Sequence, residues 1–165
     1  MRRPDIPLTT LSSADDCEQQ FYEAMQQGDV DRLMAMWADD DEIACVHPGG
    51  QRLVGPEAIR ASFESLFRSG GVDARADRVR RLEIGDTAIH HVVERVQAAN
   101  ADGPRIVLVV VTNVYVQSAL GWRMVVHHAS PNVGRGVAVE SNPGGLRTRR
   151  ADDGDGPDDV PTTLH

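Results

Sequence analysis

The chain has 165 residues, which fits one domain with tails, and its hydrophobic fraction of 41% suffices for one core. Its net charge of -8 argues against a nucleic-acid partner and against docking on an anionic membrane, because both need a basic surface. The longest apolar run, residues 106–111, is too short to span a membrane, and because no apolar run follows the arginines of residues 1–10 we do not expect this segment to be a secretory signal. Cys17 and Cys45 are expected to be buried and reduced, which favours a cytoplasmic protein.

The two ends of the chain differ in composition from its centre. Residues 1–13 contain two prolines and several Ser and Thr without periodicity, so we expect a flexible arm. Residues 132–165 are rich in Gly, Pro, Asp and Arg and contain no aromatic side chain. Such a segment buries too little surface to offset the entropy of ordering, so we expect a disordered acidic tail. One domain over residues 14–131 remains.

Three segments in the first half have apolar residues at helical spacing. These stripes are Cys17, Phe21, Ala24 and Met25; Val30, Leu33, Met34 and Trp37; and Ile59, Phe63, Leu66 and Phe67. Gly28 is placed to end the first helix and Asp29 to cap the second. Pro56 suits the first turn of the third helix.

Strands account for the rest of the domain. A short strand is expected at 42–48, followed after the third helix by strands at 73–84, 87–99, 105–117 and 121–130. Short connections predict antiparallel hairpins between the last four. The order α-α-β-α-β-β-β-β indicates an α+β fold, in which one curved antiparallel sheet wraps three helices.

The strand at 105–117 is apolar on both faces, although an antiparallel strand normally shows one face to water. The helices can cover one face only. We therefore predict a homodimer through the outer face of the sheet. The alternative is that the C-terminal tail folds over that face.

Three stretches resemble the SnoaL-like branch of the nuclear transport factor 2-like superfamily. They are GDVDRLMAMWADDDEIACVHPGG, RLVGPEAIRASFESLF and TNVYVQSALGWRMVVHHASP. The resemblance covers residues 14–131 and implies a cone-shaped α+β fold, a pocket at one end and frequent dimers. The superfamily includes isomerases, dehydratases, epoxide hydrolases, polyketide cyclases and proteins without catalysis, so the fold does not settle function.

Two adjacent histidines end the last predicted strand. Neighbours on a strand point to opposite faces, so His127 and His128 cannot share a ligand inside one domain. Trp122 and Met124 share a face with His128 in a regular strand, and this face is the more apolar one. We therefore expect His128 to point into the cone and to contact a ligand or transfer a proton, unless it is a buried neutral histidine. A β-bulge would exchange the two assignments.

Polar and aromatic side chains inside apolar segments are the other candidates, because burial without a partner is costly. Glu94 is a candidate general base, with an ion pair across the strands as its alternative. The candidates for ligand contact are Trp37, His47, Asn113, Tyr115 and Trp122. The alternatives are core packing for Trp37, an ordinary position at a strand end for His47 and an internal polar network for Asn113.

Several kinds of site are not expected. The spacing of the histidines does not favour a metal centre, and no phosphate-binding loop or dinucleotide fingerprint occurs, so no cofactor is predicted. The strand interiors lack the aspartate that a ketosteroid isomerase-like site requires. Three functions stay open. The chain binds a small, mostly apolar molecule in the cone; or it is an acid-base enzyme acting on a small carbonyl or polyketide-like substrate; or it is a dimeric association domain.

Overall fold

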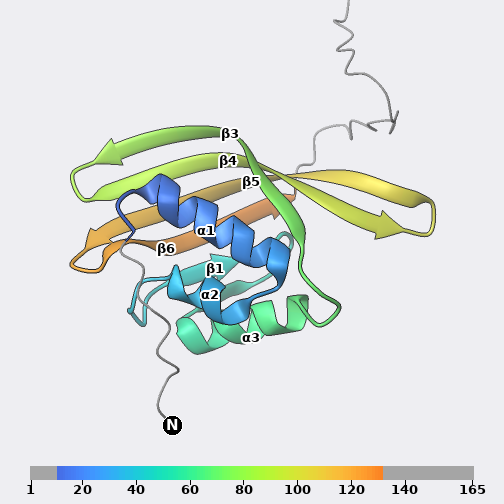
Figure 1. Cartoon of the computed structure of the whole chain (residues 1–165), viewed down its shortest axis with the longest axis horizontal. Coiled ribbons are helices and arrows are strands. Elements are labelled where there is room, and N and C mark those ends of the chain that lie inside the picture. Colours follow the sequence, from blue (N-terminus) through green and yellow to red (C-terminus); the bar gives the residue numbers. More distant parts are fainter. Residues whose placement is uncertain (1–10, 132–165) are drawn as a thin grey trace, which may run out of the picture.

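The computed structural model describes residues 11–131, with three helices and six strands in this range (Figure 1). The helices are α1 (Ala14–Gln27), α2 (Val30–Ala35) and α3 (Pro56–Leu66). The strands are β1 (Ala44–Val46), β2 (Arg52–Val54), β3 (Asp73–Ile84), β4 (Thr87–Asn100), β5 (Gly103–Ser118) and β6 (Gly121–Pro131). The strands form one sheet in the order β2-β1-β6-β5-β4-β3.

Local sequence explains where the first two helices begin and end. The Ser13 side chain accepts a hydrogen bond from the backbone N–H of Asp16 and caps α1. Gly28 ends that helix in the left-handed conformation, with φ at 66°. The Asp29 side chain then accepts from the backbone N–H of Arg32 and caps α2. Ser13, Gly28 and Asp29 therefore set the start and end of α1 and the start of α2.

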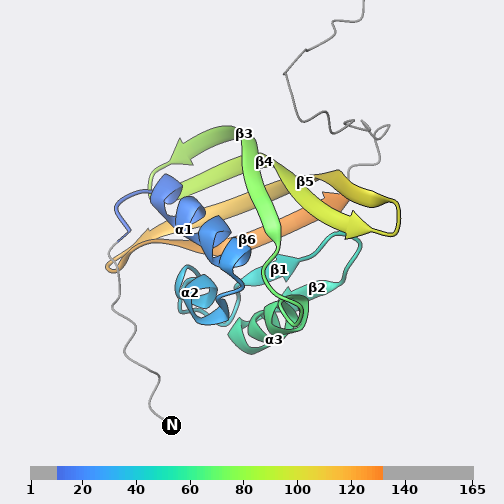
Figure 2. The ribbon, with the colours of Figure 1, turned by 45° about the vertical axis from the view of Figure 1, so that its right-hand side comes forward.

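The three helices lie on one face of the curved sheet, and α1 crosses the long strands on that face (Figures 1 and 2). The main core forms between the helices and this face of the sheet. Aromatic side chains occupy much of it, with Phe21 edge-to-face against Phe63 at a ring distance of 6.1 Å and against Trp37 at 6.4 Å. Within the described range, the opposite, outer face of the sheet carries no helix.

The predicted α+β fold is confirmed, with differences in detail. The strand β2 was not expected; it pairs antiparallel with β1, and β1 in turn pairs parallel with β6. The helix α2 ends at Ala35, so Trp37 lies beyond it and forms an isolated bridge with Met124. Leu66, expected in the buried stripe of α3, is 45% exposed. Short elements such as β2 offer too few residues for a period to be recognised.

Part of the expected N-terminal arm is ordered against the sheet. Leu11 is buried and pairs with Gly121, whose φ of 94° and close approach to Leu11 leave no room for a side chain. Residues 1–10 and the tail from 132 lie outside the described range. Cys17 and Cys45 are both buried and unpaired, as predicted. Among the residues that the structure describes, no helix has the length and apolarity that crossing a membrane requires.

Candidate functional site

A row of polar side chains crosses three neighbouring strands on the helix-covered face of the sheet. The register aligns His90 on β4 with Asn113 on β5, and Asn113 with His127 on β6. All three side chains are buried. Tyr115 lies two residues beyond Asn113, and Glu94 four residues beyond His90, on this same face. Adjacent strands in register thus bring five polar groups together in an otherwise apolar interior.

The helix α1 presents a carboxylate to this row. Oε2 of Glu18 accepts hydrogen bonds from the Tyr115 hydroxyl at 2.7 Å, from Nδ1 of His90 at 2.9 Å and from the Asn113 amide at 3.3 Å. Glu18 itself is only 4% exposed. Three donors on one oxygen match a carboxylate anion, which is how a charge is accommodated in a protein interior.

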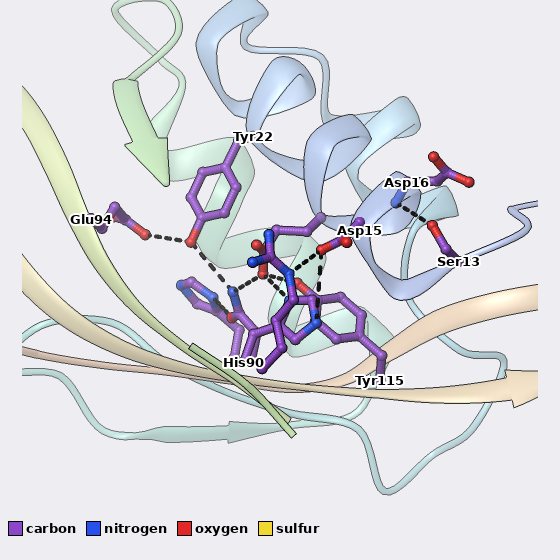
Figure 3. A network of polar contacts seen from close by, with 11 residues as sticks. Ser13, Asp15, Asp16, Tyr22, His90, Glu94 and Tyr115 are labelled. Atoms are coloured by element: carbon purple, nitrogen blue, oxygen red, sulfur yellow. Dashed lines mark hydrogen bonds and ion pairs between the residues drawn. The ribbon is translucent and has the colours of Figure 1, made fainter. Parts of the chain in front are cut away.

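A second buried carboxyl group lies close to the first. Tyr22, one turn after Glu18 on α1, donates its hydroxyl to Oε2 of Glu94 at 3.0 Å (Figure 3). Burial raises the pKa of Glu94 to about 7, and the hydrogen bond from Tyr22 opposes this in part. Burial, and then the neighbouring Glu94, raise the pKa of Tyr22 well above its ordinary value. Glu94 therefore exchanges a proton near neutral pH, as a general acid or base must.

The other end of the row is a neutral histidine. Nδ1 of His127 donates to Oδ1 of Asn113 at 2.6 Å, which assigns the ring proton to that nitrogen. Burial first, and then the neighbouring His47 and His128, lower the pKa of His127 to about 3. Its ring also packs 5.2 Å from the ring of Phe21. His127 is therefore uncharged at neutral pH and takes part in the network as a hydrogen-bond donor.

An open groove of about 480 Å³ between α1 and β3 leads to this network. Glu18 and Tyr22 belong to both the groove and the network. Eight of the ten lining residues have polar or charged side chains, and the ten are Asp15, Glu18, Gln19, Tyr22, Glu23, Gln26, Arg75, Ala76, Val79 and Arg81. The expected pocket was mostly apolar and lay inside the cone, whereas this groove is lined mainly by residues with polar side chains and lies beside α1.

The expectation that His128 points into the cone is wrong. His128 is exposed and His127 is buried. The cause is a β-bulge, because Val114 pairs with Val126 while Tyr115 pairs with Met124, which leaves Val125 without a partner on β5. One extra residue reverses the alternation from that point on. Trp122 and Met124 therefore face inward as expected, but the next inward ring is His127.

The other predicted site residues divide into two groups. Glu94, Asn113 and Tyr115 belong to the buried network, as described above. Trp37, His47 and Trp122 do not line the groove. The Trp37 ring lies in the core, and its Nε1 is buried without a hydrogen-bond partner among the described residues. Nε2 of His47 lies 2.9 Å from Oγ of Ser62, and the backbone N–H of Trp122 donates to the carbonyl oxygen of Leu11.

Glu18, Tyr22 and His90 were not predicted from the sequence as members of the site. Two patterns identify them. His90 and Glu94 share one strand face by the period of two, so a pocket role for Glu94 implies one for His90. Glu18 and Tyr22 are four residues apart and therefore lie on one face of a helix. Glu18 comes directly after Cys17 and Tyr22 directly after Phe21, both of which belong to the predicted apolar stripe. A helix face one residue wider than that stripe therefore includes Glu18 and Tyr22.

Comparisons with known proteins agree with this architecture. A family model described as a SnoaL-like domain matches residues 15–134. A candidate calcium/calmodulin-dependent protein kinase type II association domain from Thiobacillus denitrificans has 36% identity and a TM-score of 0.67, over 74% of this chain and 97% of that one. A candidate dehydratase of the nuclear transport factor 2-like family from Streptomyces avermitilis has 27% identity and a TM-score of 0.63, over 72% and 93%.

A third structure supports the fold alone. The hub of the same kinase from S. rosetta has 24% identity and a TM-score of 0.57, over 70% of this chain and 92% of that one. A comparison with curated proteins gave no match. The family model covers well over half of the residues, and the first relative exceeds 30% identity over nearly its whole length. The chain therefore belongs to the SnoaL-like family of the nuclear transport factor 2-like superfamily.

Proposed function

We propose that the chain binds a small polar molecule in the groove between α1 and β3. The observation that carries this proposal is that Glu18 and Tyr22 line the groove and at the same time belong to the buried network. A volume of about 480 Å³ is within the range of small-molecule sites. Acidic side chains from α1 face Arg75 and Arg81 from β3 across the groove. This lining favours a ligand with both hydrogen-bond donors and acceptors.

The network beneath the groove adds acid-base chemistry to binding. Tyr22 connects the groove to Glu94, whose pKa of about 7 lets it hold or release a proton under ordinary conditions. A ligand hydroxyl near Tyr22 would give its proton to the phenol oxygen while the phenol passes its own proton to the Glu94 carboxylate, and protonation of a ligand carbonyl would follow the reverse path from protonated Glu94. This retains the prediction of Glu94 as the base and replaces His128 by Tyr22 as its partner.

The experiment compares two tryptophan variants on α1. Small acids, amides and hydroxyketones are screened against the protein by changes in backbone amide NMR shifts. Gln19 lines the groove, so Gln19→Trp is expected to abolish the shift changes there. Gln27 lies on the same helix but does not line the groove, so Gln27→Trp should bind like the native chain. Equal behaviour of the two variants, or no shift changes at groove residues, would refute the proposal.

The proton-exchange part has its own readout. Binding of a carboxylic acid probe should weaken as the pH rises through about 7, since Glu94 then becomes an anion beside the groove. In Glu94→Gln this pH dependence should vanish while binding itself persists. A titration that is identical in both proteins would leave the groove as a binding site and remove Glu94 from its chemistry.

A second candidate function is association through the outer face of the sheet. The register places one apolar side chain on each of the six strands in a single row across that face. This row consists of Val54, Ala44, Val126, Val114, Ile89 and Leu82. Val54 and Leu82 are exposed at its ends, and Val110, four residues before Val114 on β5, is exposed on the same face. A continuous apolar row of this kind is typical of an interface, and the relative of 36% identity carries the name of an association domain.

The association is tested by mass in solution. We expect sedimentation velocity to give a dimer for the native chain and a monomer for Val110→Glu, because a carboxylate would then be buried in the interface. Leu120, 51% exposed in the turn between β5 and β6, supplies the control, and Leu120→Glu should remain a dimer. A native monomer would exclude this candidate.

A cytoplasmic location is also proposed, on the two buried unpaired cysteines.

A further inference from the structure

His90 has one ring nitrogen with a partner and one without. Nδ1 donates to Oε2 of Glu18 at 2.9 Å, whereas Nε2 is buried and has no hydrogen-bond partner among the described residues. The polar atom facing Nε2 is Oδ1 of Asp15, 4.0 Å away (Figure 3). The histidine is 0% exposed, so leaving that nitrogen without a partner carries a free-energy cost. This cost indicates that a further atom belongs between the imidazole and the carboxylate.

The arrangement of His90 matches that of a metal-binding histidine. In metal sites the second ring N–H is usually donated to a carboxylate, which fixes the tautomer and directs the other nitrogen's lone pair at the metal. Glu18 fulfils this role for His90. Imidazole nitrogen and carboxylate oxygen are also the ligands that Zn²⁺ accepts. In the described part of the chain, Asp15, Glu18 and His90 form a group whose ligand atoms lie within 4.8 Å of one another.

The distance between the two candidate ligand atoms is compatible with a bound ion. Bonds of about 2.0 to 2.1 Å in a tetrahedral centre place two ligand atoms about 3.4 Å apart. Oδ1 of Asp15 lies somewhat farther than this from Nε2 of His90, at 4.0 Å. The Asp15 side chain is 56% exposed at the edge of the groove and can rotate to close the difference. Water from the groove would supply the remaining ligands.

We propose that Nε2 of His90 and the Asp15 carboxylate bind a divalent transition-metal ion such as Zn²⁺, with Glu18 orienting the histidine. The site adjoins the groove, but it does not depend on an organic ligand there. One contact opposes metal binding, because Nε of Arg81 lies 2.6 Å from Oδ1 of Asp15. The guanidinium competes with the ion for that oxygen. Removing this positive charge should therefore tighten metal binding.

The test uses metal-free full-length protein and two ions. Co²⁺ is titrated and followed by its visible absorption, and Zn²⁺ is titrated by calorimetry. We expect one saturable site, with affinity at least about tenfold lower in Asp15→Asn. In Arg81→Gln the affinity should rise severalfold. His91 is the exposed neighbour of His90, and His91→Gln should bind like the native chain.

Two results would overturn the metal site. The first is the absence of saturable Co²⁺ or Zn²⁺ binding, which would assign the gap to a water donating to both Nε2 of His90 and Asp15. The second is binding that Asp15→Asn leaves intact, because the ion would then lie elsewhere. Asp15 is a surface residue, so Asp15→Asn should fold normally, and its circular dichroism checks this. Metal binding is measured without organic compounds, so its failure is separable from failure of the groove.

Discussion

Replacing Glu94 by glutamine is expected to stabilise the protein at alkaline pH and to have little effect at acid pH. The pKa of Glu94 is about 7 in the folded protein, against an ordinary value of 4.5. Between these values the folded state holds a proton that the unfolded state has released, so the stability of the native chain falls as the pH rises. A difference of about 2.5 pKa units corresponds to about 3 kcal/mol. Glutamine keeps the shape and an acceptor for Tyr22 but does not titrate.

The free energy of unfolding is measured by urea titration at intervals between about pH 4 and about pH 8, for both proteins. We expect the variant's advantage to grow by about 3 kcal/mol over this range and to level off above pH 7. His127 has the opposite effect, since its lowered pKa removes stability as the pH falls from 6.5 towards 3. That effect is common to both proteins and cancels in the difference. A difference that is constant with pH would refute the burial of a proton at Glu94.

Two further pairs of substitutions test the bulge and one close contact. His127→Ala should lower the free energy of unfolding by about 2 to 4 kcal/mol, whereas the exposed His128→Ala should change it by less than about 0.5, both measured by urea titration. The reverse order would mean that β6 has no bulge. Gly71→Ala should cost more than about 2 kcal/mol, because its Cβ would overlap the carbonyl oxygen of Gln26. Gly85→Ala, with nothing within 4 Å but a φ of 57°, should cost about 1 kcal/mol, and equal thermal shifts in the two variants would contradict this contact.

The sequence was sufficient for the layout of the fold but not for the orientation of its last strand. Long periodic segments such as 87–99 and 105–117 predicted the strands β4 and β5 within about two residues of their ends. The bulge at Val125 has no such signature, since a regular alternation and a one-residue shift both leave apolar residues on each face of β6. A single unpaired residue therefore exchanged His127 and His128. The glutamate on α1 was missed for another reason, because its partners come from strands about 70 to 100 residues away.

The two buried glutamates should respond in opposite ways to the same substitution. Glu18 receives three hydrogen bonds on one oxygen, from Tyr115, His90 and Asn113, so its charge has partners. In Glu18→Gln these donors lose an anion and, where the amide nitrogen turns toward them, an acceptor as well. We expect a loss of about 1 to 3 kcal/mol in the free energy of unfolding near pH 8.

Among the described residues, only Tyr22 donates a hydrogen bond to Glu94, so its charge is poorly compensated and glutamine should stabilise the fold at that pH. The measurement is urea unfolding of both variants in the presence of a chelator, which removes any contribution from a metal ion. A gain from Glu18→Gln would mean that the three donors do not offset the burial of its charge. The network would then be unfavourable at both carboxyl groups. Opposite signs would instead mean that the charge of Glu18 is compensated by its three donors, whereas the charge that Glu94 acquires above pH 7 is not.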